Sequence, residues 1–138
     1  MAVHGGLLRL STSGDGAIVD LTDGVRSIVG RSGVETGVAV LFAVGSTVAV
    51  TTMEYEPGGV ADLQALLDRL IPGTGDYEHN ARNHDTNAHA HLRAAVIGPS
   101  ESVPVVRGAL GLGTWQQVVL IDFDDRPRER TIVVHVLS

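Results

Sequence analysis

Two strand-like segments follow one another almost without a break, and they constrain the fold more than any other feature. The first, Val34–Val44, contains the apolar run Val38–Val44, which is typical of a strand buried on both faces. The second, Ser46–Tyr55, follows after a single glycine and is rich in threonine and valine, the β-branched residues that suit strands. A chain with two such neighbouring strands is expected to form a sheet, with a hydrophobic core packed against it.

The rest of the chain supplies more strands and a few helices. Strands are predicted over Leu7–Ser13, Ala17–Leu21, Ser102–Val106, Trp115–Phe123 and Thr131–Leu137. Helices are predicted around Val25, Ile28 and Val29, which form one apolar stripe, and over Val60–Ile71, which ends at Pro72. The last two strands, joined by the charged turn Asp124–Pro127, are predicted to form a β-hairpin. We therefore expect an α+β fold: a single domain over residues 1–138 with a mostly antiparallel sheet of about seven strands and two or three helices.

Composition excludes several classes of function. The 138 residues include no cysteine, so disulfides, thiolate metal sites and a cysteine nucleophile are excluded. There is no lysine either, which excludes a Schiff base and leaves arginine as the strong phosphate-binding side chain. A net charge of −6 argues against a nucleic-acid or anionic-membrane surface. No apolar run approaches the ~20 residues of a membrane span, and no signal-peptide pattern is present. We expect a soluble cytoplasmic protein.

The stretch Tyr77–Ile97 is the best candidate for a functional site. It contains four of the six histidines: His79, His84, His89 and His91. A polar loop, which also holds Asp85, runs here into a short apolar segment, and loops on a rigid scaffold often present functional side chains.

The local structure of this stretch is open. In a strand, His89 and His91 would point the same way and form a His-x-His metal arrangement. In a helix capped by Asn87, their side chains would diverge by about 200°. Periodicity does not decide between them. We interpret His84 and His89 as polar residues of a surface loop, whereas for His79 and His91 a site and a surface role are equally supported.

Other polar clusters are weaker candidates. Glu54 and Glu56 lie at strand spacing and suit either a base or metal ligand, or a solvated strand end. The arginines of Arg126–Arg130 suit an anion site, but next to Asp122, Asp124 and Asp125 an ion-paired turn is favoured. The glycines of Gly108–Gly113 indicate tight turns, because this segment does not open a helix after a strand as a dinucleotide-binding loop does. No Gly-x-Ser-x-Gly elbow supports a serine hydrolase.

Several segments together resemble one known family. The segment Gly108–Val118 (GALGLGTWQQV), with Ser100 and Ser102 upstream, is similar to the signature of the YjbQ-like family, also called secondary thiamine-phosphate synthases. The triplet Tyr77-Glu78-His79, the run NAHAHLR with the five residues after it, and the tail Asp122–Arg130 resemble it as well. The similarity covers essentially the whole chain, and Gly113–Gln116 is its most specific part. The resemblance implies a small α+β domain that forms a compact homotrimer. For some members it implies weak thiamine-phosphate-synthase activity, in which a pyrimidine diphosphate joins a thiazole phosphate and pyrophosphate is lost.

The resemblance transfers only to matching positions. His79 and His91 match family histidines, and Glu54 matches a family glutamate although Met53 and Tyr55 replace its asparagine neighbours. Many members carry His-Thr-Thr-Ala or His-Ser-Thr-Ala where this chain has Gly45-Ser46-Thr47-Val48, so one expected histidine is absent. If three histidines bind a metal in those members, Glu54, Asp85 or His89 would have to complete the set here.

We therefore expect a transferase of the thiamine-phosphate-synthase type. Its catalytic residues would be His79, His91 and Glu54, and a weakly held divalent ion, zinc or magnesium, would bind His79, His91 and Asp85. The predicted substrate-binding residues are Ser46, Thr47, Arg93, Gly113, Thr114, Trp115 and Gln116. The alternative is a non-catalytic binding protein for a small phosphorylated or anionic metabolite. A homotrimer is the expected assembly, with neither nucleic acid nor membrane as a partner.

Overall fold

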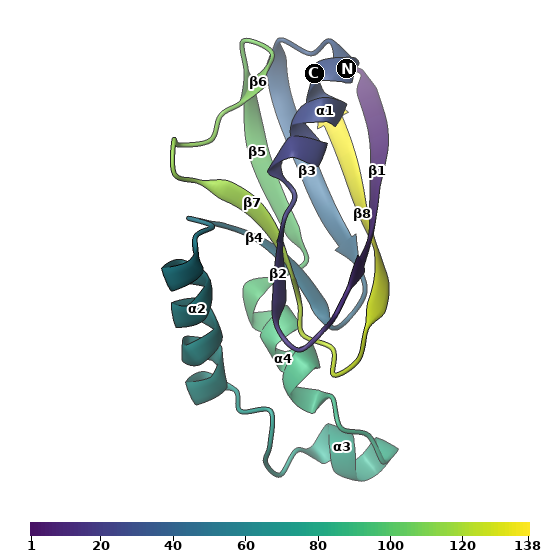
Figure 1. Ribbon diagram of the computed structural model, residues 1–138. Helices are drawn as coiled ribbons and strands as arrows, with labels where there is room; N and C mark the ends of the chain where they lie inside the picture. The colour runs from purple at the N-terminus through teal and green to yellow at the C-terminus, as the bar shows by residue number, and fades with distance from the viewer.

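Two antiparallel sheets pack face to face and enclose the main core (Figure 1). The computed structural model describes residues 1–138, and its eight strands and four helices confirm the single-domain α+β class. The five-stranded sheet has the order β1-β8-β3-β5-β6 and the three-stranded sheet the order β2-β7-β4. The strands are β1 (Val3–Thr12), β2 (Ala17–Asp20), β3 (Thr36–Val44), β4 (Val48–Met53), β5 (Ser100–Val106), β6 (Ala109–Leu110), β7 (Gln117–Asp122) and β8 (Arg128–Leu137).

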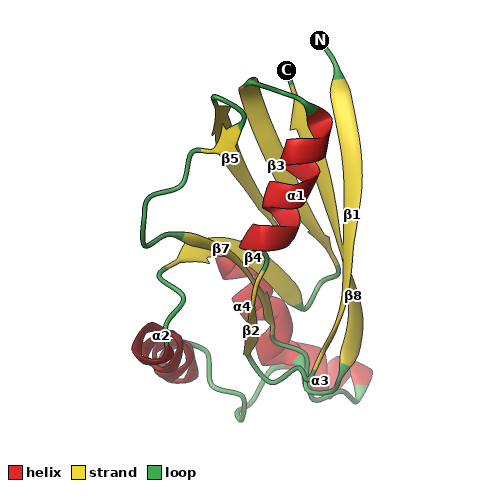
Figure 2. Ribbon diagram, turned by 45° about the horizontal axis from the view of Figure 1, so that its top comes forward, coloured by secondary structure: helices red, strands yellow, loops and turns green.

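The helices cover different layers. They are α1 (Thr22–Ser32), α2 (Pro57–Leu70), α3 (Glu78–Asn83) and α4 (Ala88–Ile97). Helix α1 adds Val25, Ile28 and Val29 to the core between the sheets, and Figure 2 shows it lying across the five-stranded sheet. Helices α2 and α4 cover the other face of the three-stranded sheet, where Leu67 and Ala90 join a second apolar cluster. No helix has both the length and the apolar character needed to cross a membrane.

The histidine-rich stretch is helical. Asn87 stands at the N-cap position of α4 and Gly98 at its end, so the strand interpretation of His89 and His91 is wrong. Helix is favoured because Ala90 and Ala94, one turn apart, pack onto the three-stranded sheet. His89 is 9% exposed and belongs to the buried side of α4, which corrects its interpretation as a surface residue.

The outer face of the five-stranded sheet has no covering layer. Alternate residues of β3 point inward, and Leu41 is fully buried. Phe42 and Val44 on the opposite side are 46% and 53% exposed. The expectation that this strand is buried on both faces is therefore wrong for the isolated chain, because α1 and the three-stranded sheet both lie on the same side of it.

The predicted C-terminal hairpin is also wrong. Strand β7 pairs with β2 and β4, whereas β8 pairs with β1 and β3 in the other sheet. The turn after β7 therefore passes from one sheet to the other, as Figure 1 shows. Asp122 of β7 and Arg130 of β8 form an ion pair across this crossing.

Candidate functional site

Helices α3 and α4 bring two histidines together. His79 lies on α3 and His91 on α4, with ring centroids 4.6 Å apart and planes inclined by 58°. The short connection of residues 84–87 folds α3 back on α4 because His84 adopts the left-handed conformation at the end of α3. We call His79 and His91 the histidine pair.

The contacts of the pair indicate which ring nitrogens carry protons. Nδ1 of His91 lies 3.2 Å from the carbonyl oxygen of Ser46, which only accepts, so Nδ1 donates. Neutral His91 then keeps a free lone pair on Nε2. Nε2 of His79 lies 3.1 Å from Oδ1 of Asn87 and 3.8 Å from Oδ2 of Asp85, so this nitrogen is the donor of His79.

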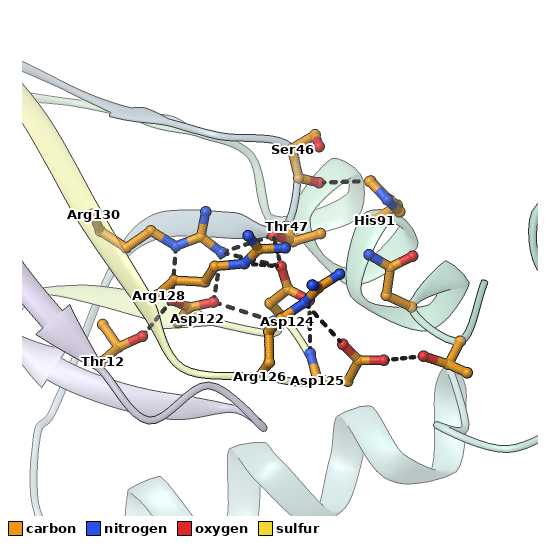
Figure 3. Close-up of polar contacts among 12 residues, drawn as sticks. Thr12, Ser46, Thr47, His91, Asp122, Asp124, Asp125, Arg126, Arg128 and Arg130 are labelled. Atoms are coloured by element: carbon orange, nitrogen blue, oxygen red, sulfur yellow. Dashed lines mark hydrogen bonds and ion pairs between the residues drawn. The ribbon is translucent and has the colours of Figure 1, made fainter.

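A cluster of four charged side chains, three of them buried, lies at the crossing between the sheets (Figure 3). Asp122 and Asp124 are 0% and 1% exposed, and Arg130 is 8% exposed. Arg130 grips Asp122 with two parallel hydrogen bonds, from Nε and Nη2, each 2.7 Å long. Nε of Arg128 donates to Asp124 over 2.7 Å. We call Asp122, Asp124, Arg128 and Arg130 the acid–arginine cluster.

The loop of residues 45–47, between β3 and β4, connects this cluster to the histidine pair. Its Ser46 carbonyl holds His91. Thr47 is buried, accepts from Nη2 of Arg130 over 2.7 Å, and donates to Oδ2 of Asp124 over 3.2 Å. Figure 3 shows Thr47 among the side chains of the cluster, with Ser46 and His91 above it. A second link is the hydroxyl of Thr86, in the connection before α4, which donates to Asp125.

Hydrogen bonding keeps the buried carboxylates ionised. Burial raises the pKa of Asp122, but hydrogen bonds from Arg130 and Thr12 outweigh it and leave that pKa below its usual value. Burial likewise raises the pKa of Asp124, yet the hydrogen bonds from Arg128 and the Asp125 backbone lower that pKa to about 2. His89 differs, since burial, followed by the positive charge of Arg93, lowers its pKa.

A shallow hollow opens between the loop and α4. Its volume is about 310 Å³, and it is lined by Gly45, Ser46, Val48, His91, Ala94, Ala95 and Pro99. That volume lies at the lower end of the range for small-molecule sites. His91, whose imidazole can bind and release a proton, therefore lines this hollow. The loop on the other side of the hollow contacts the acid–arginine cluster through Thr47.

The structure brings together some of the predicted site residues. His79, His91, Asp85 and Ser46 are neighbours, and Thr47 is adjacent to them. No three histidine, aspartate or glutamate side chains converge closely enough to hold a metal ion. The histidine pair and Asp85 are therefore not a preformed metal site in this conformation, and the divalent ion stays a prediction.

Arg93 does not join the histidine pair, contrary to expectation. Because it lies two residues after His91 on a helix, its side chain points about 200° away. Its buried guanidinium donates to Asp68 and to the carbonyl of Ile71, at 2.7 to 3.0 Å, and so fastens α4 to the end of α2.

The remaining predicted residues lie at the other end of β4. Glu54 follows the last residue of β4, and Gln116 donates to Thr52 over 3.0 Å. Gly113, Thr114 and the 73%-exposed Trp115 precede Gln116 in the same loop. The loop of residues 45–47 precedes the first residue of β4, and six strand residues span about 20 Å. Within one chain, the predicted site is thus divided into two separate groups, and Arg93 belongs to neither of them.

Sequence reasoning missed the importance of Arg130. The ion-paired turn that it favours is confirmed by the Asp122–Arg130 and Asp124–Arg128 pairs, but it does not predict that these carboxylates are buried. A signal was present: Arg130 shares the strand alternation of Ile132, Val134 and Val136, all of which are buried. A charge in register with core residues indicates a buried partner.

Comparison with known proteins gives one consistent result. The profile of the UPF0047 protein YjbQ-like family matches residues 7–138. A UPF0047 protein of Methanothermobacter thermautotrophicus is 37% identical over 136 residues, which cover 99% of this chain and 93% of that protein. The crystal structure of a YbjQ-like protein from Sulfolobus solfataricus P2 superposes with a TM-score of 0.90 at 32% identity, covering 99% of both chains. A hypothetical protein from Aeropyrum pernix K1 superposes with a TM-score of 0.90 at 34% identity, covering 97% of this chain and 98% of that one.

Proposed function

The chain belongs to the UPF0047 family of YjbQ-like proteins, and we propose that it acts on a small phosphorylated metabolite at the histidine pair. The observation that supports this most strongly is the setting of His91. Its Nδ1 is tied to the Ser46 carbonyl, so its Nε2 is free to exchange a proton beside the hollow. His79, with its ring centroid 4.6 Å away, supplies a second proton carrier.

The reaction we propose is a transfer of the thiamine-phosphate-synthase type. The thiazole ring nitrogen forms a bond to the pyrimidine methylene carbon with its lone pair. The bond from that carbon to the diphosphate oxygen breaks, its electron pair stays on the oxygen, and inorganic diphosphate leaves. The main demand is neutralisation of the charge that develops on the leaving group. Protonated His91, with Nε2–H facing the diphosphate, meets that demand, and His79 assists it.

The second candidate is binding of a phosphorylated or anionic metabolite without turnover. It is favoured by the division of the predicted residues, because Glu54 and Trp115 lie at the far end of β4 from the histidine pair. A single chain then keeps the carboxylate of Glu54, the predicted catalytic one, apart from the histidine pair. The weakly held divalent ion stays a prediction, and none of the steps above depends on it.

Turnover separates the two candidates. The purified protein, incubated with the pyrimidine diphosphate and the thiazole phosphate, is expected to yield thiamine phosphate and one inorganic diphosphate per product. Mass spectrometry measures the first and an enzyme-coupled assay the second, with each substrate alone as a control. Calorimetric binding of either substrate with no product, even at protein concentrations equal to substrate, would favour the binding function and contradict the transferase.

A homotrimer is the assembly we propose. The outer face of the five-stranded sheet exposes Leu7, Phe42 and Val44 by about half each, at 52%, 46% and 53%, and such patches are typical of interfaces. In a closed ring, two different surfaces of one chain meet on neighbouring copies. Such an assembly offers the Trp115 loop a neighbouring chain to contact.

Light scattering coupled to size exclusion tests the assembly. We expect a mass of three copies of the 14.5 kDa chain. Phe42→Glu, which places a charge on the uncovered face, is expected to shift the mass toward one copy, whereas Arg107→Glu, on the exposed turn after β5, is the control. A stable single-copy mass for the unmodified protein at micromolar concentration would contradict the trimer.

A further inference from the structure

We propose that Arg130 presents one free guanidinium nitrogen, Nη1, to a phosphate group of the ligand, through a gap that Gly45 leaves open. The inference rests on the proposed function, since it names the cation that receives the phosphate. It assigns the anion site to a residue of the acid–arginine cluster.

The hydrogen bonds of Arg130 leave Nη1 unused. Nε and Nη2 together donate to both oxygens of Asp122, and Nη2 also donates to Thr47. Nη1 makes no hydrogen bond. The only side-chain nitrogen or oxygen that is both fully buried and without a partner is Nδ1 of His89, so Nη1 retains contact with solvent. A fixed guanidinium with two unused N–H groups is suited to an anion.

Gly45 determines whether Nη1 can be reached. A Cβ atom at this position would lie 2.7 Å from Nη1 and 3.0 Å from Cγ1 of Val48. Gly45 has φ of +153°, a backbone conformation that side chains disfavour. Because Gly45 and Val48 both line the hollow beside His91, the missing Cβ opens a path from the hollow to Arg130.

The surroundings select a phosphate group rather than any anion. Arg130 is already paired with Asp122, and Asp124 lies 3.9 Å from Nη2, so a weakly charged ligand gains little here. A ligand with several oxygens has more to gain, because His91 lines the hollow and Nη1 lies next to Gly45, which lines it too, so that one oxygen can face each donor. The chain's net charge of −6 disfavours unspecific binding of anions. The expected ligand class is therefore a phosphate or diphosphate ester.

Calorimetric titration with inorganic diphosphate tests the inference. The unmodified protein should bind it, and Gly45→Ala should weaken binding about tenfold or more, because the methyl group covers Nη1, which Asp122 and Thr47 hold in place. Gly75→Ala is the matched control, since Gly75 has the same φ of +153° but its Cβ would meet only Tyr77, at 3.7 Å. This control should change affinity less than about twofold. Arg130→Lys, with folding checked by circular dichroism, should weaken binding as Gly45→Ala does.

Two results would overturn the inference: no diphosphate binding by the unmodified protein, or equal affinities for Gly45→Ala and Gly75→Ala. The outcomes also separate it from the proposed function. If diphosphate binding depends on Gly45 but no thiamine phosphate forms, the anion site stands and the transferase fails. If product forms equally fast with Gly45→Ala, the transferase stands and the anion site fails.

Discussion

Arg130→Met is expected to lower the free energy of unfolding by about 3–5 kcal/mol. The substitution leaves Asp122, which is 0% exposed, without the guanidinium that gives both of its oxygens a partner. It also removes a partner of Thr47 and so loosens the crossing between the two sheets. Urea denaturation followed by circular dichroism measures the effect.

Arg126→Met is the matched control. Arg126 comes from the same turn, but its side chain is 60% exposed and its nearest carboxylate, on Asp125, is 4.0 Å away. Exposed pairs of this kind contribute at most about 1 kcal/mol. Similar losses of unfolding free energy for Arg130→Met and Arg126→Met would show that the acid–arginine cluster does not hold the sheets together.

The loss of unfolding free energy caused by Arg130→Met should depend on pH. In the unmodified protein the pKa of Asp122 lies below its usual value, so its ionic contribution to stability is present above the unfolded pKa of 3.8 and declines as the pH falls below it. Without Arg130, burial raises the pKa of Asp122 instead, and the ionised form destabilises the fold until it is protonated. The difference in stability between the two proteins should therefore narrow between about pH 7 and about pH 3. A constant difference across that range would contradict the proposed role of the ionised Asp122.

His91→Asn is expected to lower kcat by about 100-fold or more, the usual effect of losing a general acid. The asparagine amide places an N–H donor near the position of Nδ1, so it keeps the contact with the Ser46 carbonyl while it removes the proton carried on Nε2. Because the loop of residues 45–47 is then retained, KM should change much less than kcat. Steady-state kinetics of thiamine phosphate formation measures both constants.

His84→Asn is the control for this experiment. His84 is exposed and left-handed at the end of α3, a conformation that asparagine also tolerates. The kcat of the His84→Asn variant should stay within about twofold of the value for the unmodified protein. An equal loss of kcat in both variants, or a normal kcat in His91→Asn, would place the proton donor elsewhere.

Local patterns predicted the elements of the fold better than their pairing. Periodicity and turn residues located most of the strands and the helix over Val60–Ile71, because these depend on neighbours in the sequence. The apolar pattern predicts a strand over Trp115–Phe123, but it does not predict the partners of that strand. Strand pairing is a choice among distant segments with similar alternation. After Asp122 the chain crosses to the other sheet, where Arg130, eight residues later, pairs with Asp122.

For the candidate site, too, the sequence predicted some features and only the structure revealed the others. The sequence alone determined that arginine must supply any fixed cation, since lysine is absent, and it indicated His79 and His91 as the candidate site histidines. Only the tertiary structure decided which arginine lies near them. Helical geometry turns Arg93 away toward Asp68, while the return of β8 beside β3 places Arg130 under Gly45. The physical reason is that a side chain's direction follows from its own helix or strand, whereas its neighbours across the core follow from how distant elements pack.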